Sequence, residues 1–251
     1  MQVPRVIPCL LLTDEGLVKT LKFRNPRYIG DPINAVKIFN EKEVDELILL
    51  DIDATTNSRG PLFEVIEAIA AECFMPLAYG GGITSVDEAQ EVLRRGAEKV
   101  CLNTVTVENP SLVSDLASSF GSQSVLVSID VRKKLLGGYE VFVKGGRHKT
   151  GIDPLTHAVK MEELGAGEIM INSIDRDGTE SGYDLELIRL ISSQVNVPVV
   201  ACGGAGSMHD FSRAIHDGGA SAVAAGSLFV YHGPRRAVLI SYPSQREIRE
   251  L

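Results

Sequence analysis

Two glycine-rich turns, about half a chain apart, are the segments of this sequence best suited to bind phosphate. The first reads Gly80-Gly81-Gly82 and the second reads Gly203-Gly204, and each follows a short apolar run. Glycine lets backbone N–H groups approach an anion without a Cβ atom in the way, and a helix that begins just after the turn adds a favourable dipole. One such turn is weak evidence, because many are only tight loops. The repeat predicts two phosphate sites and therefore a ligand phosphorylated at both ends.

Small and hydroxyl residues complete both predicted sites. The apolar run after the first turn ends at Asn103-Thr104, and the run after the second ends at Gly226-Ser227. Each of these pairs can present backbone N–H groups to an anion. We therefore assign phosphate binding to Gly81, Gly82, Asn103 and Thr104 in the first half of the chain, and to Asp177, Gly178, Gly203, Gly204, Gly226 and Ser227 in the second.

Asp130 is the candidate for proton transfer. It ends the apolar run Val125–Asp130, so a strand would place its carboxylate at the strand's C-terminal end. A carboxylate held there can serve as a general acid or base. The alternative is a structural role, in which Asp130 pairs with Lys19 or Arg132.

Strands that alternate with helices must position these residues. Eight short apolar or β-branched runs fall near residues 5–10, 46–53, 76–80, 99–103, 124–130, 168–173, 198–202 and 222–226. Asp31, Asn109 and Asp153 each precede a proline, which predicts a capping residue followed by the first helical position. Ser85 and Glu88 fit a capping box directly after the first glycine turn.

These elements predict one α/β domain, a (β/α)8 TIM barrel spanning residues 1–251. The internal repeat extends upstream, where residues 46–53 parallel residues 168–175, so the barrel should contain two equivalent halves. A doubly wound open sheet is the alternative, but it would not explain why the halves match so evenly.

Charged residues at the starts of four strands form a second polar group. Arg5, Glu46, Lys99 and Glu168 each enter an otherwise apolar run. In a barrel, strand starts lie at the end opposite the chemistry. Two cations and two anions that face the barrel axis would neutralise each other, whereas single buried charges would be costly. An ordinary inter-strand salt-bridge cluster is the simpler interpretation.

Composition excludes several classes of function. The 251 residues are 44% hydrophobic and 23% charged with a formal charge of −8, which is typical of a folded globular protein and argues against nucleic acid as a partner. No apolar run is long enough to span a membrane, and no signal-peptide pattern is present, so we expect a cytoplasmic protein without a membrane partner. The four cysteines form no C-x-x-C pair, and the five histidines lack metal-ligand spacing. We expect reduced core cysteines, no metal and no cofactor.

Several motifs carry a resemblance to a known family. They are Ile7-Pro8-Cys9-Leu10, Gly30-Asp31-Pro32, Gly80-Gly81-Gly82-Ile83, Asn103-Thr104, Phe120-Gly121-Ser122-Gln123, Ser173-Ile174-Asp175-Arg176-Asp177-Gly178-Thr179 and Gly203-Gly204-Ala205-Gly206. Over roughly residues 4–229 the chain resembles the cyclase (synthase) subunit of imidazole glycerol phosphate synthase. The resemblance implies a barrel that receives ammonia from a separate glutaminase subunit and reacts it with a bisphosphorylated nucleotide-like substrate. It also implies that the four charged residues at the strand starts form an ammonia gate.

One departure from that family affects catalysis. The family uses two aspartates, which end the first and fifth strands, and here Asp130 is present but Leu11 stands at the other place. A leucine cannot transfer a proton, and loss of one such group lowers the rate roughly a hundred- to ten-thousand-fold. The resemblance also assigns substrate contacts to Lys19, Asp51, Asn172 and Cys202, of which Asn172 replaces a threonine and Cys202 a serine.

The retained gate and the missing aspartate together resemble one branch of the family. In that branch a cyclase-like subunit and a glutaminase-like subunit take part in converting an acetamido sugar to an acetamidino sugar, with a third, amide-activating enzyme as the ammonia acceptor. We favour this function and a heterodimer with a glutaminase. The alternatives are the cyclase subunit of histidine biosynthesis, which is a lyase, and a non-catalytic scaffold that activates a glutaminase.

Overall fold

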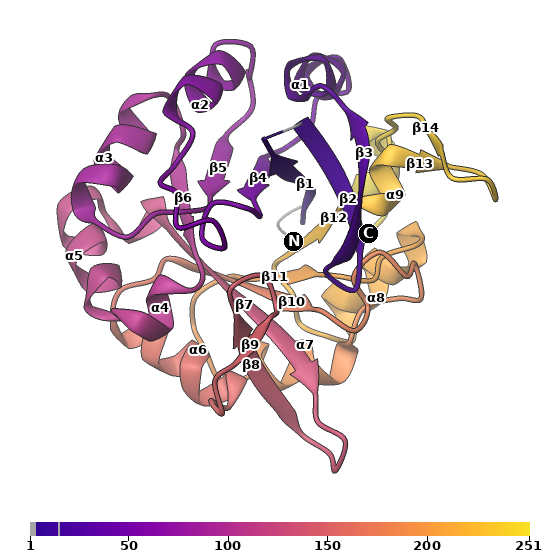
Figure 1. Cartoon of the computed structure of the whole chain (residues 1–251). Coiled ribbons are helices and arrows are strands. Elements are labelled where there is room, and N and C mark those ends of the chain that lie inside the picture. Colours follow the sequence, from indigo (N-terminus) through magenta and orange to yellow (C-terminus); the bar gives the residue numbers. More distant parts are fainter. Residues whose placement is uncertain (1–3, 15) are drawn as a thin grey trace.

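The protein is a closed barrel of eight parallel strands. The structure is a computed structural model that describes residues 4–14 and 16–251. The barrel strands are β1 (Arg5–Thr13), β4 (Leu47–Asp51), β5 (Leu77–Gly80), β6 (Lys99–Leu102), β7 (Val125–Lys133), β10 (Glu168–Ser173), β11 (Val199–Cys202) and β12 (Ala222–Ala225). Pairing between β7 and β10, and between β12 and β1, closes the sheet (Figure 1). The predicted TIM barrel is therefore confirmed, and the open sheet is excluded.

Helices cover the outside of the barrel (Figure 1). The longer ones are α1 (Pro32–Glu41), α2 (Phe63–Ala70), α3 (Val86–Arg94), α5 (Ser111–Phe120), α6 (Pro154–Glu163), α7 (Leu185–Ser192) and α8 (Met208–His216). Shorter pieces are α4 (Val105–Glu108), η1 (Ser122–Ser124), α9 (Ser227–Val230) and α10 (Gln245–Arg249). Among the described residues, no helix is both long and apolar enough to cross a membrane.

Most of the predicted helix caps are confirmed. The side chains of Asp31 and Asp153 accept hydrogen bonds from backbone N–H groups in the first turns of α1 and α6, and Ser85 and Glu88 form the predicted capping box on α3. The prediction for Asn109 is wrong, because α5 begins one residue later, after Pro110, and Asn109 ends the preceding helix α4 instead. The residue before α5 is Pro110, whose backbone is already helical and which makes no side-chain capping hydrogen bond.

Apolar side chains pack on both faces of the barrel wall, in one cluster outside the barrel and one inside it. The larger cluster lies between the outer face of the strands and the helices, and it includes Phe39, Tyr79 and Phe211. The smaller cluster fills the barrel interior with the inward-facing side chains Ile7, Cys9, Ile48, Ala78, Cys101, Leu126, Met170, Val200, Cys202, Ala222 and Ala224. Strand residues alternate between these two environments, as the period of two requires.

Hairpins extend the barrel at the C-terminal ends of its strands. The segment after the first barrel strand is the hairpin β2 (Gly16–Leu21) and β3 (Arg24–Gly30). β7 continues into a second hairpin with β8 (Tyr139–Val143), which pairs with β9 (His148–Lys149). We call them the first and the second hairpin.

The C-terminal region forms a small hairpin followed by one short helix. Residues 230–243 contain the small hairpin β13 (Tyr231–His232) and β14 (Ala237–Val238). Gly233 lies at a φ of +70°, and Pro234 supplies no backbone N–H, so a helix cannot continue through this point. Only α10 is helical beyond it.

The two halves of the barrel are equivalent in register. Leu11 pairs with Leu50 between β1 and β4, and Asp130 pairs with Asn172 between β7 and β10. Ser85 and Ser207 cap the helices that follow the two glycine turns in the same way. This agreement supports the predicted duplication and identifies Leu11 as the structural counterpart of Asp130.

Candidate functional site

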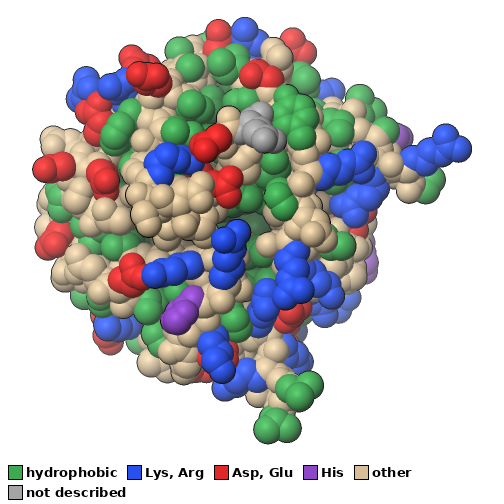
Figure 2. Space-filling view, viewed as in Figure 1, with side chains coloured by type: hydrophobic (Ala, Val, Ile, Leu, Met, Phe, Trp, Pro, Cys, Tyr) green, Lys and Arg blue, Asp and Glu red, His purple; other side chains and the backbone are tan. Residues whose placement is uncertain are grey.

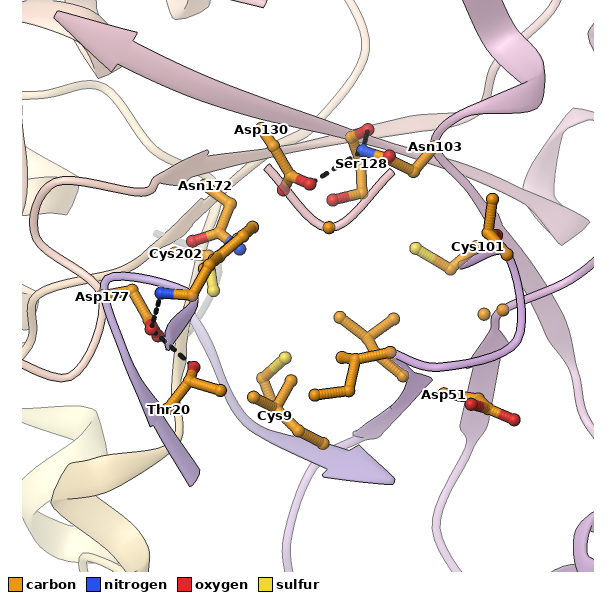
Figure 3. Close-up of a pocket in the computed structure, with 18 of the residues that line it drawn as sticks. Cys9, Thr20, Asp51, Cys101, Asn103, Ser128, Asp130, Asn172, Asp177 and Cys202 are labelled. Atoms are coloured by element: carbon orange, nitrogen blue, oxygen red, sulfur yellow. Dashed lines mark hydrogen bonds between the residues drawn. The ribbon is translucent and has the colours of Figure 1, made fainter. Parts of the chain in front are cut away.

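A pocket opens at the C-terminal ends of the barrel strands, and we call this opening the mouth. All the residues predicted for phosphate binding, substrate contact and proton transfer line it: Lys19, Asp51, Gly81, Gly82, Asn103, Thr104, Asp130, Asn172, Asp177, Gly178, Cys202, Gly203, Gly204, Gly226 and Ser227. Figure 3 shows Asp130, Asn103 and Asn172 on one side of the opening and Asp51 on the other. The structure therefore brings these predicted residues together around one opening.

Asp130 lies on the wall of this pocket with little exposure to solvent. The Nδ2 atom of Asn103 donates a hydrogen bond of 3.1 Å to its Oδ2 atom. Burial raises the pKa of Asp130 to about 7, and the negative charge of Asp177 acts in the same direction. The alternative pairing is not formed, since Arg132 packs against Phe142 and Lys19 lies nearest to Asp177. A carboxyl with a pKa near 7 can both give and take a proton at neutral pH.

In the first half of the barrel, leucines stand at the positions equivalent to Asp130 and Asn172. Leu11 and Leu50 occupy the places that Asp130 and Asn172 occupy in the second half, and both leucines line the pocket. Leu11 is 8% exposed. Of these two equivalent positions, only the one on β7 carries a carboxylate.

The glycine turns are shaped in the way that anion binding requires. Gly81 and Gly203 have φ angles of +127° and +85°, and a Cβ atom at either would lie 2.5 Å or 2.7 Å from the carbonyl oxygen of Asp51 or Ser173. Only glycine fits these positions. The next N–H groups, of Gly82 and Gly204, donate to no acceptor within the described part of the chain. Both turns therefore present free donors to the pocket, followed by helix N-termini.

The first hairpin holds Asp177 and Lys19 at the second glycine turn. The hydroxyl of Thr20 donates to Asp177 Oδ2 at 2.7 Å, and the backbone N–H of Phe23 donates to the same oxygen at 3.2 Å. Lys19 Nζ lies 4.0 Å from Asp177 Oδ1. Gly226 permits this placement, because a Cβ atom there would lie 2.4 Å from Lys19 Nζ. A buried ammonium group thus stands beside the second predicted phosphate site.

Arg236 is a residue near this site that sequence reasoning missed. Its guanidinium donates to the carbonyl oxygen of Gly178 at 3.3 Å and 3.4 Å and to Ser227 Oγ at 3.3 Å. It also packs over the ring of Tyr231 and pairs with Glu180. The sequence contains no signal for this placement, because Arg236 comes from the C-terminal hairpin and reaches the site only through the tertiary fold.

Asp51 has its hydrogen-bonding capacity occupied. Arg59 Nη1 lies 2.8 Å from its Oδ2, and the backbone N–H groups of Asp53 and Ala54 donate to its Oδ1. Its carboxylate turns away from the opening (Figure 3). Its visible role is to fix the loop after β4 beside the first glycine turn.

Asn172 and Cys202 form part of the pocket floor. The buried Oδ1 atom of Asn172 has no hydrogen-bond partner, and its amide favours the charged form of Asp130. Cys202, Cys9 and Cys101 are buried free thiols, as expected for reduced core cysteines. Burial raises the pKa of the Cys101 thiol well above its usual value, which makes this thiol unreactive.

The four charged residues at the strand starts form a closed ring. Arg5 contacts both Glu46 and Glu168, and Lys99 Nζ lies 2.6 Å from Glu46 and 2.9 Å from Glu168. Each cation therefore binds both anions and the charges cancel around the axis. The carboxylates are buried, while Arg5 and Lys99 are partly exposed. We call these four residues the charged ring.

The charged ring and the pocket lie at opposite ends of the barrel interior. The apolar interior cluster separates them, and it includes small side chains such as Ala78, Ala222 and Ala224. Cys9, Cys101 and Cys202 belong both to this cluster and to the pocket lining. Within the described residues, no group of three or more His, Cys, Asp or Glu side chains is arranged to hold a metal ion.

Comparisons with known proteins agree with this geometry. A family described as "Histidine biosynthesis protein" matches residues 5–234. The chain is 55% identical over 244 residues to a Pseudomonas aeruginosa protein with the provisional name imidazole glycerol phosphate synthase subunit hisF2, covering 97% of each chain. It is 51% identical over 251 residues to a provisionally named HisF subunit of Leptospira interrogans, covering 98% of each. It is also 44% identical to imidazole glycerol phosphate synthase subunit HisF of Alkaliphilus metalliredigens, covering 92% of each.

Proposed function

This chain belongs to the histidine-biosynthesis protein family, whose members include imidazole glycerol phosphate synthase subunits, and we propose that it is the ammonia-receiving barrel subunit of a glutamine amidotransferase. A separate glutaminase subunit binds at the N-terminal ends of the barrel strands in a 1:1 complex. Ammonia passes through the charged ring and along the barrel axis to the pocket. The final product is an acetamidino sugar formed from an acetamido sugar.

The charged ring is the observation that carries this proposal. A ring of alternating Arg5, Glu46, Lys99 and Glu168 at the end of the barrel opposite the pocket has no role in the chemistry at the mouth. It closes the axis with ion pairs, and when one pair separates to let a molecule pass, each carboxylate still contacts the other cation. An uncharged molecule such as ammonia crosses the apolar interior behind it without the desolvation penalty that an ion would suffer.

Leu11 is the reason to favour sugar conversion over imidazole formation. The register makes Leu11 the counterpart of Asp130, so the pocket has one acid/base group where the cyclase reaction uses two. All the residues predicted to bind phosphate line the pocket, which favours the cyclase of histidine biosynthesis as a second candidate. The raised pKa of Asp130, to about 7, favours either reaction over a purely non-catalytic scaffold.

The test supplies the protein and its glutaminase with glutamine and each candidate acceptor in turn. We expect an amidino product when an acetamido sugar nucleotide and its amide-activating enzyme are present. With the bisphosphorylated nucleotide we expect turnover at least about a hundredfold below an ordinary enzyme rate of roughly ten per second. Turnover of the bisphosphorylated substrate at that ordinary rate would reject sugar conversion in favour of the cyclase.

A further inference from the structure

Positive charge is concentrated in the two hairpins that surround the mouth. Residues 16–30 and 131–149 hold ten of the 25 Lys and Arg residues of the chain but only one of its 33 Asp and Glu residues. The ten are Lys19, Lys22, Arg24, Arg27, Arg132, Lys133, Lys134, Lys144, Arg147 and Lys149. Figure 2 shows Lys and Arg side chains gathered around the central hollow of this face. A protein with a formal charge of −8 thus has a basic face at its mouth.

Most of these cations do not serve the pocket. Only Lys19 and Arg147 line it. Lys22, Arg24, Arg27, Lys134 and Lys149 are exposed, and none of them forms an ion pair within the described ranges, whereas Lys133 and Lys144 do. Unpaired cations that lie outside a ligand site are available to an acidic surface.

The second hairpin also carries an exposed apolar tip. Leu135 and Leu136 are 101% and 99% exposed, the highest values among the exposed large hydrophobic residues of the described chain. A turn fixes the tip, since Lys134 N–H donates to Gly138 O at 2.9 Å and Gly137 N–H to Lys134 O at 3.1 Å. In Figure 1 the hairpin projects well beyond the helices. Two adjacent leucines held away from the protein's own core are suited to enter a pocket on a partner.

We propose that the enzyme that accepts the ammonia docks on this basic face, with an acidic surface over the mouth and an apolar pocket around the Leu135-Leu136 tip. This inference rests on the proposed function, because it names where the acceptor binds. Ammonia leaves the barrel at the mouth, so an acceptor seated there shields it from solvent. The opposite face remains available to the glutaminase, and both enzymes can bind at once.

The test measures binding and ammonia transfer separately. Sedimentation velocity without glutamine detects the complex between the barrel–glutaminase pair and the amide-activating enzyme. Leu135→Ser/Leu136→Ser should raise the Kd of this complex at least about tenfold. Leu135→Ile/Leu136→Ile, which keeps the apolar side chains, should bind about as tightly as the wild type. Arg24→Glu/Lys134→Glu should weaken it about tenfold at low salt and less at high salt. Lys160→Glu, an exposed charge reversal on the outer helix α6, is the matched control.

The outcomes separate this inference from the proposed function. Weaker complexes in the serine and glutamate variants, with glutaminase activity unchanged and more free ammonia released, support the docking face. Variants that bind as tightly as the wild type overturn it, even where amidino product still forms. Failure of the wild-type pair to aminate the sugar rejects the proposed function instead, whatever the sedimentation shows. Vesicles of phosphatidylglycerol are the second probe. If the wild type binds these vesicles, and the serine and glutamate variants lose vesicle binding but still form the enzyme complex, the face is assigned to a membrane surface instead.

Discussion

At the scale of single residues, the burial of Asp130 lowers the stability of the folded protein at neutral and alkaline pH. Burial keeps its pKa near 7, against an ordinary value of 3.8. Between about pH 4 and 7 the folded protein keeps a proton that the unfolded chain releases, so this group lowers the free energy of unfolding as the pH rises through that window. Above pH 7 the loss is complete.

Asp130→Asn should therefore stabilise the protein at alkaline pH while it removes the acid/base group. We expect a free energy of unfolding higher by about 1–3 kcal/mol near pH 8, and little gain near pH 4. Urea denaturation at the two pH values measures it. Asp51→Asn is the control, since it removes the buried carboxylate that pairs with Arg59, leaves only the exposed carboxylate of Asp14, and should destabilise the protein near pH 8. Equal effects of Asp130→Asn at both pH values would contradict the assignment.

The Leu11 position gives a second prediction at this scale. Leu11→Asp alone would bury a new carboxylate against Leu50, without the amide that Asn172 supplies to Asp130. Leu11→Asp/Leu50→Asn recreates that polar pair, so cyclase turnover with ammonium salts should rise more in the double variant than in Leu11→Asp, and by at least about tenfold over the wild type. Imidazole glycerol phosphate formation measures it. Leu50→Asn alone should give no increase, and a gain from that control would show that the carboxylate is not responsible.

At the scale of the elements, sequence patterns were sufficient for the barrel strands and insufficient for the hairpins. The eight barrel strands are buried, so their apolar runs identify them. β3 is almost wholly exposed and polar, and only its pairing with β2 makes it a strand. The glycine turns were predictable because the sequence repeat carries them, and Asp130 was predictable because it ends the apolar run Val125–Asp130. Arg236 was not, because its contact with Gly178 joins segments that are 58 residues apart.

The C-terminal hairpin should make the two anion sites unequal. Arg236 adds a guanidinium at Gly178 and Ser227, and a charge-assisted hydrogen bond is worth about 1.5–3 kcal/mol. Arg236→Ala should weaken phosphate binding at the second site about tenfold or more and leave the site at Gly82 and Thr104 unchanged. Titration with inorganic phosphate, with crystals to identify the sites, measures this. Arg235→Ala, which removes an exposed neighbouring charge, is the control, and equal losses in both variants would assign the effect to net charge.

At the scale of the whole molecule, the charged ring lies at one end of the barrel and the pocket at the other. In the proposed complex the charged ring faces the glutaminase, and the pocket and basic face are turned to the ligand and the acceptor. The apolar interior joins them along the axis. If the proposal is right, coupling between the two ends depends on the ring remaining closed until ammonia passes it.

Lys99→Ala tests that dependence. The substitution leaves Arg5 as the only cation beside Glu46 and Glu168, so two buried carboxylates share one partner and the ring must open or distort. Glutaminase activity should persist while ammonia escapes, and the ratio of aminated product to glutamate should fall below the wild-type ratio. Lys160→Ala on the outer helix α6 is the control for loss of a lysine. If the product-to-glutamate ratio stays the same in Lys99→Ala and the wild type, the ring is a structural salt-bridge cluster, because a gate that controls passage cannot lose half of its cations without releasing ammonia.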